Sequence, residues 1–145
     1  MLTALSLLAF APSLCWAADQ TRQDDVRARS AEVMPFDMGA TTHVFTKTPT
    51  GGVQRVVAKN AGDLKQIKLV RAHLKDIADK FSRGDFSGPR QVHGAAMPGL
   101  AELQAAPSGD LQTLYRDIKS GAEIRYTSVD PKIVAALHEW FDAQH

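Results

Sequence analysis

Hydrophobic and polar residues alternate along two pairs of short segments, the pattern expected of strands with one buried face. In the first pair, residues 42–47 and 53–59 are separated by Thr-Pro-Thr-Gly-Gly. In the second pair, residues 111–118 and 122–128 are separated by Lys-Ser-Gly. Turn-forming residues between two strand-like segments favour a tight reversal of the chain. Each pair therefore predicts a β-hairpin.

Two longer segments carry apolar residues three and four positions apart, which predicts amphipathic helices. The first helix is expected to begin at a cap formed by Asn60 or Asp63 and to end near Gly84. The second follows Asp130-Pro131, an N-cap with proline at the first helical position. The apolar positions of the two helices are Ile67, Val70, Leu74, Ile77, Ala78 and Phe81, and Ile133, Val134, Leu137, Trp140 and Phe141.

The segment between the first helix and the second hairpin is rich in glycine and proline. We expect residues 84–99 to be irregular and a short helix to run from Pro98 to Ala105. The resulting order is a loose repeat of one hairpin-and-helix unit. It predicts an α+β fold in which the two units form a four-stranded antiparallel sheet with helices on one face.

The first eighteen residues carry no charge and include an apolar run, residues 2–14, too short to span a membrane. The run ends in Cys-Trp-Ala-Ala, which suits cleavage by a signal peptidase. We therefore expect a signal peptide at 1–18, a flexible leader at 19–33 and a single α+β domain at 34–145. The expected location is the periplasm or the medium, with no membrane anchor after cleavage.

The composition argues against several kinds of binding partner, metal site and enzyme. The 17 basic and 16 acidic residues are interspersed and give a net charge of +1, which argues against nucleic acid and anionic membranes as partners. Cys15 is the one cysteine and lies in the predicted signal peptide, so disulfides and thiolate zinc sites are not expected. No hydrolase elbow, phosphate loop or dinucleotide motif is present, and the sequence favours a non-enzymatic role.

The candidate chemistry lies in histidine and methionine. All five histidines fall within residues 34–145, together with three methionines. Imidazole suits Cu(II) and thioether suits Cu(I), so a thiol-free exported chain with both is suited to copper. His93 and Met97 lie four positions apart in the irregular segment. The predicted metal ligands are His93 and Met97, joined by His43, His73 or His138, with Asp85 and Asp142 as carboxylates that orient the rings.

Three functions follow, of which the first is preferred. The chain is expected to be a small periplasmic protein that binds a transition metal, most plausibly copper, without catalysing a reaction. The alternative is an accessory or interaction module for another envelope protein, in which His73 and His138 are core-edge residues and the methionines fill the core. The third is a small hydrolase or transferase with a Ser or Thr nucleophile and His43 or His93 as base.

Several segments resemble an uncharacterised family of small secreted bacterial proteins. They are MPFDM, TTHVFTKTPTGGVQRVVAK, GDF, HGAAMPGL, GAEIRYTS and LHEWFDAQ, which together span most of residues 33–145. Some members of that family carry the label aspartate carbamoyltransferase. That enzyme is a much longer cytosolic chain with a Ser-Thr-Arg-Thr-type phosphate-binding run, which this sequence lacks. The resemblance implies secretion and not that activity.

Overall fold

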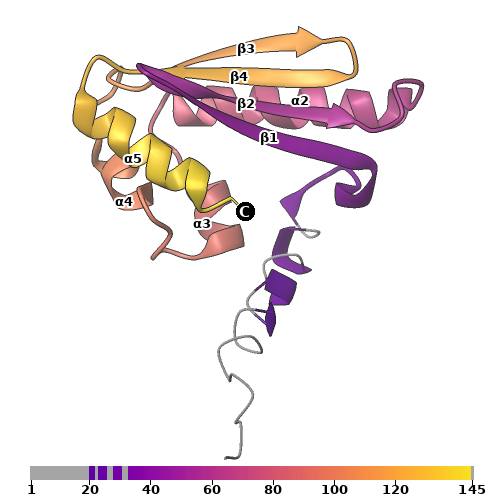
Figure 1. Cartoon of the computed structure of the whole chain (residues 1–145), viewed down its shortest axis with the longest axis horizontal. Coiled ribbons are helices and arrows are strands. Elements are labelled where there is room, and N and C mark those ends of the chain that lie inside the picture. Colours follow the sequence, from indigo (N-terminus) through magenta and orange to yellow (C-terminus); the bar gives the residue numbers. More distant parts are fainter. Residues whose placement is uncertain (1–19, 22, 26–27, 31–32, 145) are drawn as a thin grey trace, which may run out of the picture.

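The computed structural model describes residues 20–21, 23–25, 28–30 and 33–144 (Figure 1). The predicted signal peptide, residues 1–18, lies outside these residues. The elements are the 3-10 helix η1 (Met38–Ala40), β1 (Thr41–Thr48), β2 (Gly51–Ala58), α2 (Leu64–Phe81), α3 (Ser87–His93), α4 (Leu100–Ala105), β3 (Gln112–Ile118), β4 (Gly121–Thr127) and α5 (Pro131–Asp142). The α+β fold predicted from the sequence is confirmed.

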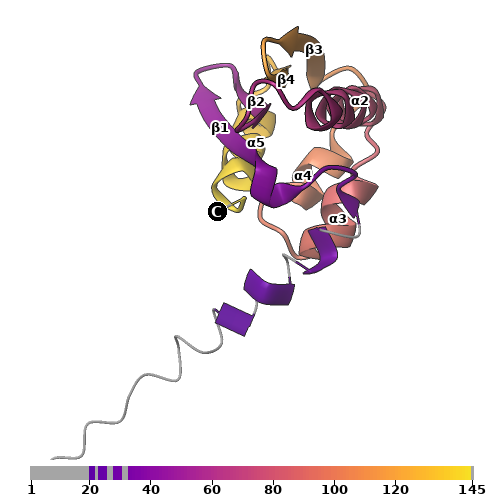
Figure 2. The same cartoon turned by 90° about the vertical axis from the view of Figure 1, so that its right-hand side faces the viewer.

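The four strands form one antiparallel sheet in the order β1-β2-β4-β3, so each predicted hairpin supplies one edge strand and one central strand. On the central strands, alternate residues point into the core and are buried. They are Gln54, Val56 and Ala58 on β2, and Ala122, Ile124 and Tyr126 on β4. Figures 1 and 2 show all labelled helices on this side of the sheet.

The two long helices begin at the predicted caps. The carboxylate of Asp63 accepts a hydrogen bond from the backbone N–H of Gln66 (3.1 Å), and that of Asp130 accepts one from Lys132 (2.8 Å). Satisfying these otherwise unpaired N–H groups stabilises the first turn. The residues that the helices bury are Ile67, Val70, Leu74, Ala78 and Phe81 on α2, and Ile133, Ala136, Leu137, Trp140 and Phe141 on α5.

The segment expected to be irregular contains a helix that the sequence pattern did not predict. Ser87–His93 form α3, and α4 begins at Leu100, two residues after the expected start. The sequence of α3 has no apolar stripe at spacings of three and four, and Val92 is the one residue that the helix buries. Packing of Val92 and the preceding Phe86 into the core stabilises this helix in place of an amphipathic stripe.

Gly99 allows α4 to approach α5 closely. Its φ is +72°, and a Cβ at this position would lie 2.0 Å from the carbonyl oxygen of Ala136. Both the backbone conformation and the lack of space require glycine. The short connection between α3 and α4 is therefore held against the last helix.

The described residues from 20 to 33 are helical, although the sequence there has no apolar period. Ser30 is buried, and its carbonyl accepts a hydrogen bond from Met34 N (2.7 Å). Helical conformation does not measure mobility, so the flexible leader stays a prediction. Among the described helices, none is both long and apolar enough to cross a membrane.

Candidate functional site

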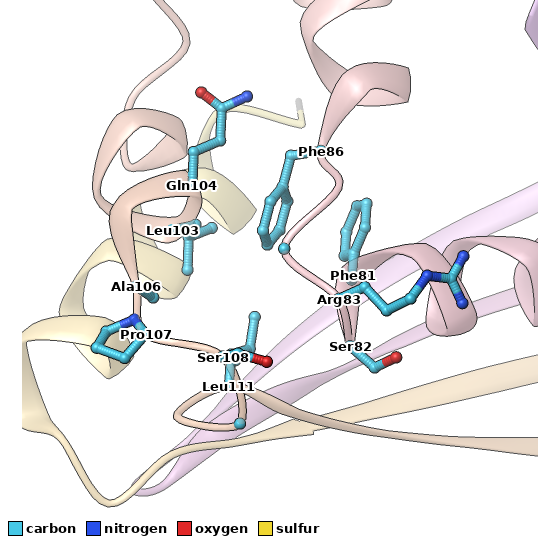
Figure 3. A pocket seen from close by; sticks show the side chains of 12 residues that line it. Phe81, Ser82, Arg83, Phe86, Leu103, Gln104, Ala106, Pro107, Ser108 and Leu111 are labelled. Atoms are coloured by element: carbon cyan, nitrogen blue, oxygen red, sulfur yellow. The ribbon is translucent and has the colours of Figure 1, made fainter.

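The described part of the chain contains two cavities that merit comparison. The smaller, about 240 Å³, lies between the end of α2, α4 and residues 106–111 (Figure 3). The rings of Phe81 and Phe86 form part of its wall, while the polar ends of Arg83 and Gln104 point away from these rings. This cavity is small and offers few polar groups that converge on a ligand.

The larger cavity, about 1120 Å³, is a cleft between the inner face of β1 and β2 and the helices α2, α3 and α5. We call it the histidine cleft, because His43 of β1, His73 of α2 and His93 of α3 all line it. The remaining walls are mainly apolar or aromatic. They include Met34, Met38, Phe45, Ile77, Phe81, Val92 and Trp140.

His43 and His73 reach the cleft because strand alternation and helical spacing direct them inward. The buried ring of Phe36 lies beside both, with centroids 5.6 Å from His43 and 5.5 Å from His73. Burial lowers the pKa of both His43 and His73. For His73 this outweighs the negative charge of Asp76, which raises the pKa. Both rings are therefore neutral at pH 7.

Two buried nitrogen atoms in residues that line the cleft have no hydrogen-bond partner among the described residues. They are Nε2 of His73 and Nε1 of Trp140. Trp140 is only 3% exposed and packs against the rings of Phe81 and Phe141 at 5.7 and 5.5 Å. A buried polar group without a partner costs about 1–3 kcal/mol, so two in one cleft wall require an explanation.

Gln54 adds a further polar group. Its Oε1 accepts a hydrogen bond from the buried hydroxyl of Tyr126 (2.7 Å), and burial raises the pKa of that hydroxyl well above its usual value. With the hydroxyl as the donor, the amide oxygen of Gln54 is the acceptor and its NH2 group is left to donate elsewhere. The NH2 group of Gln54 has no hydrogen-bond partner among the described residues. The side chain lines the cleft.

Charged groups lie on the wall of the cleft formed by α2 and the residues after it. Lys80 and Asp76 form an ion pair (2.7 Å). Hydrogen bonding from the side chain of Ser87, and then from its backbone N–H (3.0 Å), lowers the pKa of Asp85. These groups already have partners. The histidine cleft thus combines apolar walls, neutral imidazoles and a small number of available donors.

Of the predicted metal ligands, the structure brings three to one cleft and places two elsewhere. His43, His73 and His93 line the histidine cleft, whereas Met97 is buried in the hydrophobic core. Nε2 of His138 donates to the carbonyl oxygens of Gly51 (2.8 Å) and Thr48 (3.1 Å), which holds the β1–β2 turn against α5.

The predicted supporting carboxylates are also divided. Asp85 lines the cleft, while Asp142 forms an ion pair with Lys47 at the edge of the sheet. Among the described residues, no group of three or more His, Cys, Asp or Glu side chains is arranged to hold a metal ion.

Among the described residues, Thr41 and His43 place a hydroxyl and an imidazole close enough to be considered as a nucleophile and its base. Thr41 Oγ1 lies 3.4 Å from His43 Nε2, but the hydroxyl donates to the backbone carbonyl of Asp37 (3.1 Å). A hydroxyl that donates to a carbonyl does not give its proton to the imidazole at the same time. The geometry supports binding more directly than hydrolysis.

Sequence reasoning missed Gln54 and the role of Trp140. Gln54 is in phase with the inward-facing Val56 and Ala58, and a polar residue at a buried strand position was the available signal. The apolar pattern correctly predicts Trp140 on the buried stripe of its helix, but it does not show that the N–H of Trp140 has no partner among the described residues.

Comparison with protein-family models, curated proteins and solved structures finds no match to this chain. The resemblance to a secreted bacterial family therefore stays a prediction. The fold and the cleft together define an α+β protein with a large cavity whose walls are mainly apolar and include three histidines.

Proposed function

We propose that this protein binds a small, largely apolar organic molecule in the histidine cleft. The observation that carries the proposal is a cavity of about 1120 Å³ whose lining includes His73 and Trp140, two residues whose nitrogens Nε2 and Nε1 are buried without a partner among the described residues. Ligand sites are typically the largest apolar cavity in a protein, with a few polar groups that fix orientation. Both nitrogens are buried below the cavity surface, so a ligand that accepts hydrogen bonds would pair with them once the side chains around them move.

The charge state of the walls supports a neutral ligand. His43 and His73 are uncharged at pH 7, and the indole of Trp140 and the amide of Gln54 donate without carrying charge. The charged residues on the walls are Lys80, Asp76 and Asp85. Lys80 and Asp76 are paired with each other, and the Asp85 carboxylate accepts a hydrogen bond from Ser87 N. The expected ligand is therefore a neutral molecule with an apolar body and one or more carbonyl or ether oxygens.

The proposal is tested with Nile red, a neutral dye with an apolar body and a carbonyl acceptor. Ile77 lines the cleft, so Ile77→Trp narrows it, whereas Leu64 on the same helix is 74% exposed and outside it. We expect saturable dye fluorescence with the parent chain and with Leu64→Trp. We expect Ile77→Trp to raise the Kd at least tenfold, which is about 1.4 kcal/mol. Equal binding by both variants would refute the assignment.

A copper site is the second candidate, and one observation favours it. Three histidines and two methionines, Met34 and Met38, line the same cleft, which gives imidazole and thioether donors to one cavity. Calorimetric titration with Cu(II) and Cu(I) distinguishes the candidates. Copper binding that is lost in His43→Ala and kept in His138→Ala, with no dye binding by the parent chain, would favour the metal.

A further inference from the structure

The outer face of the sheet carries an uncovered surface that the histidine cleft does not use. Figures 1 and 2 show the labelled helices on the opposite side of the four strands. Strand alternation directs Val44, Arg55, Leu114 and Arg125 to this outer side. Leu114 is 66% exposed and Val44 is 43% exposed, so this face presents large apolar side chains to solvent.

This face carries a net positive charge. The ionisable strand residues that point outward are Arg55, Arg116, Arg125 and Glu123, which gives a formal charge of +2 from three arginines and one glutamate. The whole chain carries +1, so the remaining residues together carry −1. The outer face therefore presents a net positive surface to an anionic partner.

Glu123 fixes two of the arginines in place. Strand register sets Val44, Arg55, Glu123 and Arg116 in one row across the sheet. Arg55 donates to Oε2 of Glu123 from Nη2 (2.9 Å) and Nε (3.3 Å), and Arg116 donates to Oε1. The Glu123 side chain is only 4% exposed, while those of Arg55 and Arg116 are 50% and 66% exposed. Their remaining N–H groups are thus held ready for a second acceptor.

We propose that this face docks a protein partner that presents carboxylates beside apolar side chains. Guanidinium groups bind carboxylates through two parallel hydrogen bonds, and arginine is enriched in protein interfaces. Val44 and Leu114 lie among the arginines, and they would bury apolar surface against such a partner. A nucleic acid or other polyanion fits less well, because its uniform charge requires a longer basic surface without exposed aliphatic residues.

The test uses the full chain labelled with ¹⁵N and two synthetic peptides of equal charge, one alternating Glu with Val over eight residues and one alternating Glu with Ser. We expect the Glu-Val peptide to shift outer-face amide signals saturably and to bind more tightly than the Glu-Ser peptide. Arg125 has no ion pair among the described residues, so Arg125→Glu leaves the Glu123 pairs intact. We expect that variant to weaken binding at least tenfold and Lys68→Glu, on exposed α2 surface, to leave it unchanged.

Leu114→Ser separates the apolar contribution from the charge. A drop in affinity for the Glu-Val peptide, with affinity for the Glu-Ser peptide unchanged, supports the proposed mixed surface. Equal affinity for both peptides, or tighter binding of heparin that is insensitive to Leu114→Ser, would overturn it in favour of a polyanion site. Absence of saturable shifts up to about 1 mM peptide would also overturn it. These outcomes are independent of dye binding in the histidine cleft.

Discussion

His73 and His138 each lie on one of the two long helices, but their surroundings are opposite in kind. His138 donates from Nε2 to two backbone carbonyls, whereas Nε2 of His73 is buried with no partner among the described residues. The first histidine stabilises the fold, and the second lowers its stability. A group that opposes folding and lines a cavity is a candidate for ligand binding.

Substituting each histidine by leucine separates these roles. His73→Leu removes an unsatisfied polar atom, so we expect the free energy of unfolding to rise by about 1 kcal/mol. His138→Leu leaves the carbonyls of Thr48 and Gly51 without their donor, and we expect a loss of about 1–3 kcal/mol. Urea denaturation of both variants measures the difference. A destabilised His73→Leu protein would show that the ring has a partner that the described residues do not reveal.

Protonation of the buried histidines predicts a dependence of stability on pH. Burial holds the pKa of His43 and His73 below the ordinary 6.5, so the unfolded chain takes up protons at a higher pH than the folded chain. Stability is therefore full above about pH 6.5 and is lost as the pH falls toward the lowered values. We expect the Tm to drop as the pH falls from about 6.5 to 5.5, above the carboxylate range.

The double variant His43→Gln, His73→Leu is the control for this pH dependence. It removes both titrating groups, so its Tm should change less over the same range. An identical drop in the parent chain and the double variant would assign the pH dependence to other groups. Dye binding measured in parallel would show whether protonation also disfavours a neutral ligand.

At the scale of elements, the contact between α4 and α5 depends on Gly99. Gly99→Ala places a Cβ 2.0 Å from Ala136 O and forces alanine into positive φ, so we expect a loss of about 2–4 kcal/mol. Gly88 in α3 has open space where a Cβ would lie, and Gly88→Ala should be neutral or stabilising by up to about 1 kcal/mol. Urea titration of both variants tests the difference, and equal effects would contradict this account of the close contact.

The elements that the sequence predicts are those with a local physical signal. Alternation places both hairpins, and Asp63 and Asp130 mark both long helices, because each signal acts over a few residues. Helix α3 has no such signal, since tertiary packing of Phe86 and Val92 stabilises it. Residue pattern alone could not show it.

The candidate site was predictable only in part, for a related reason. His43, His73 and His93 are far apart in sequence, and the folding of β1, α2 and α3 around one cavity brings them together. The four-residue spacing of His93 and Met97 suggested a shared site. The chain leaves α3 after His93, however, and turns Met97 into the core. The spacing of two residues along the sequence does not predict that their side chains point the same way when a helix ends between them.

At the scale of the whole molecule, the two faces of the sheet differ in chemistry. The inner face supports the histidine cleft, with neutral and apolar walls, and the outer face carries exposed arginines among aliphatic residues. A small-molecule site and a protein-docking surface can therefore operate on opposite sides of one sheet. The accessory-module function predicted from the sequence and the ligand-binding function proposed from the cleft are compatible.

The order of the strands also has a consequence for folding kinetics. Within the first hairpin the most distant partners, Thr41 and Ala58, are 17 positions apart, whereas the pairing of β2 with β4 joins Gly51 to Thr127, 76 positions away. Closing a long loop costs more chain entropy than closing a short one, and contacts distant in sequence slow folding. We expect each hairpin to form early and the zipping of β2 against β4 to limit the rate. Until that step is complete, both central strands expose unpaired edges, and the chain is then most prone to aggregate.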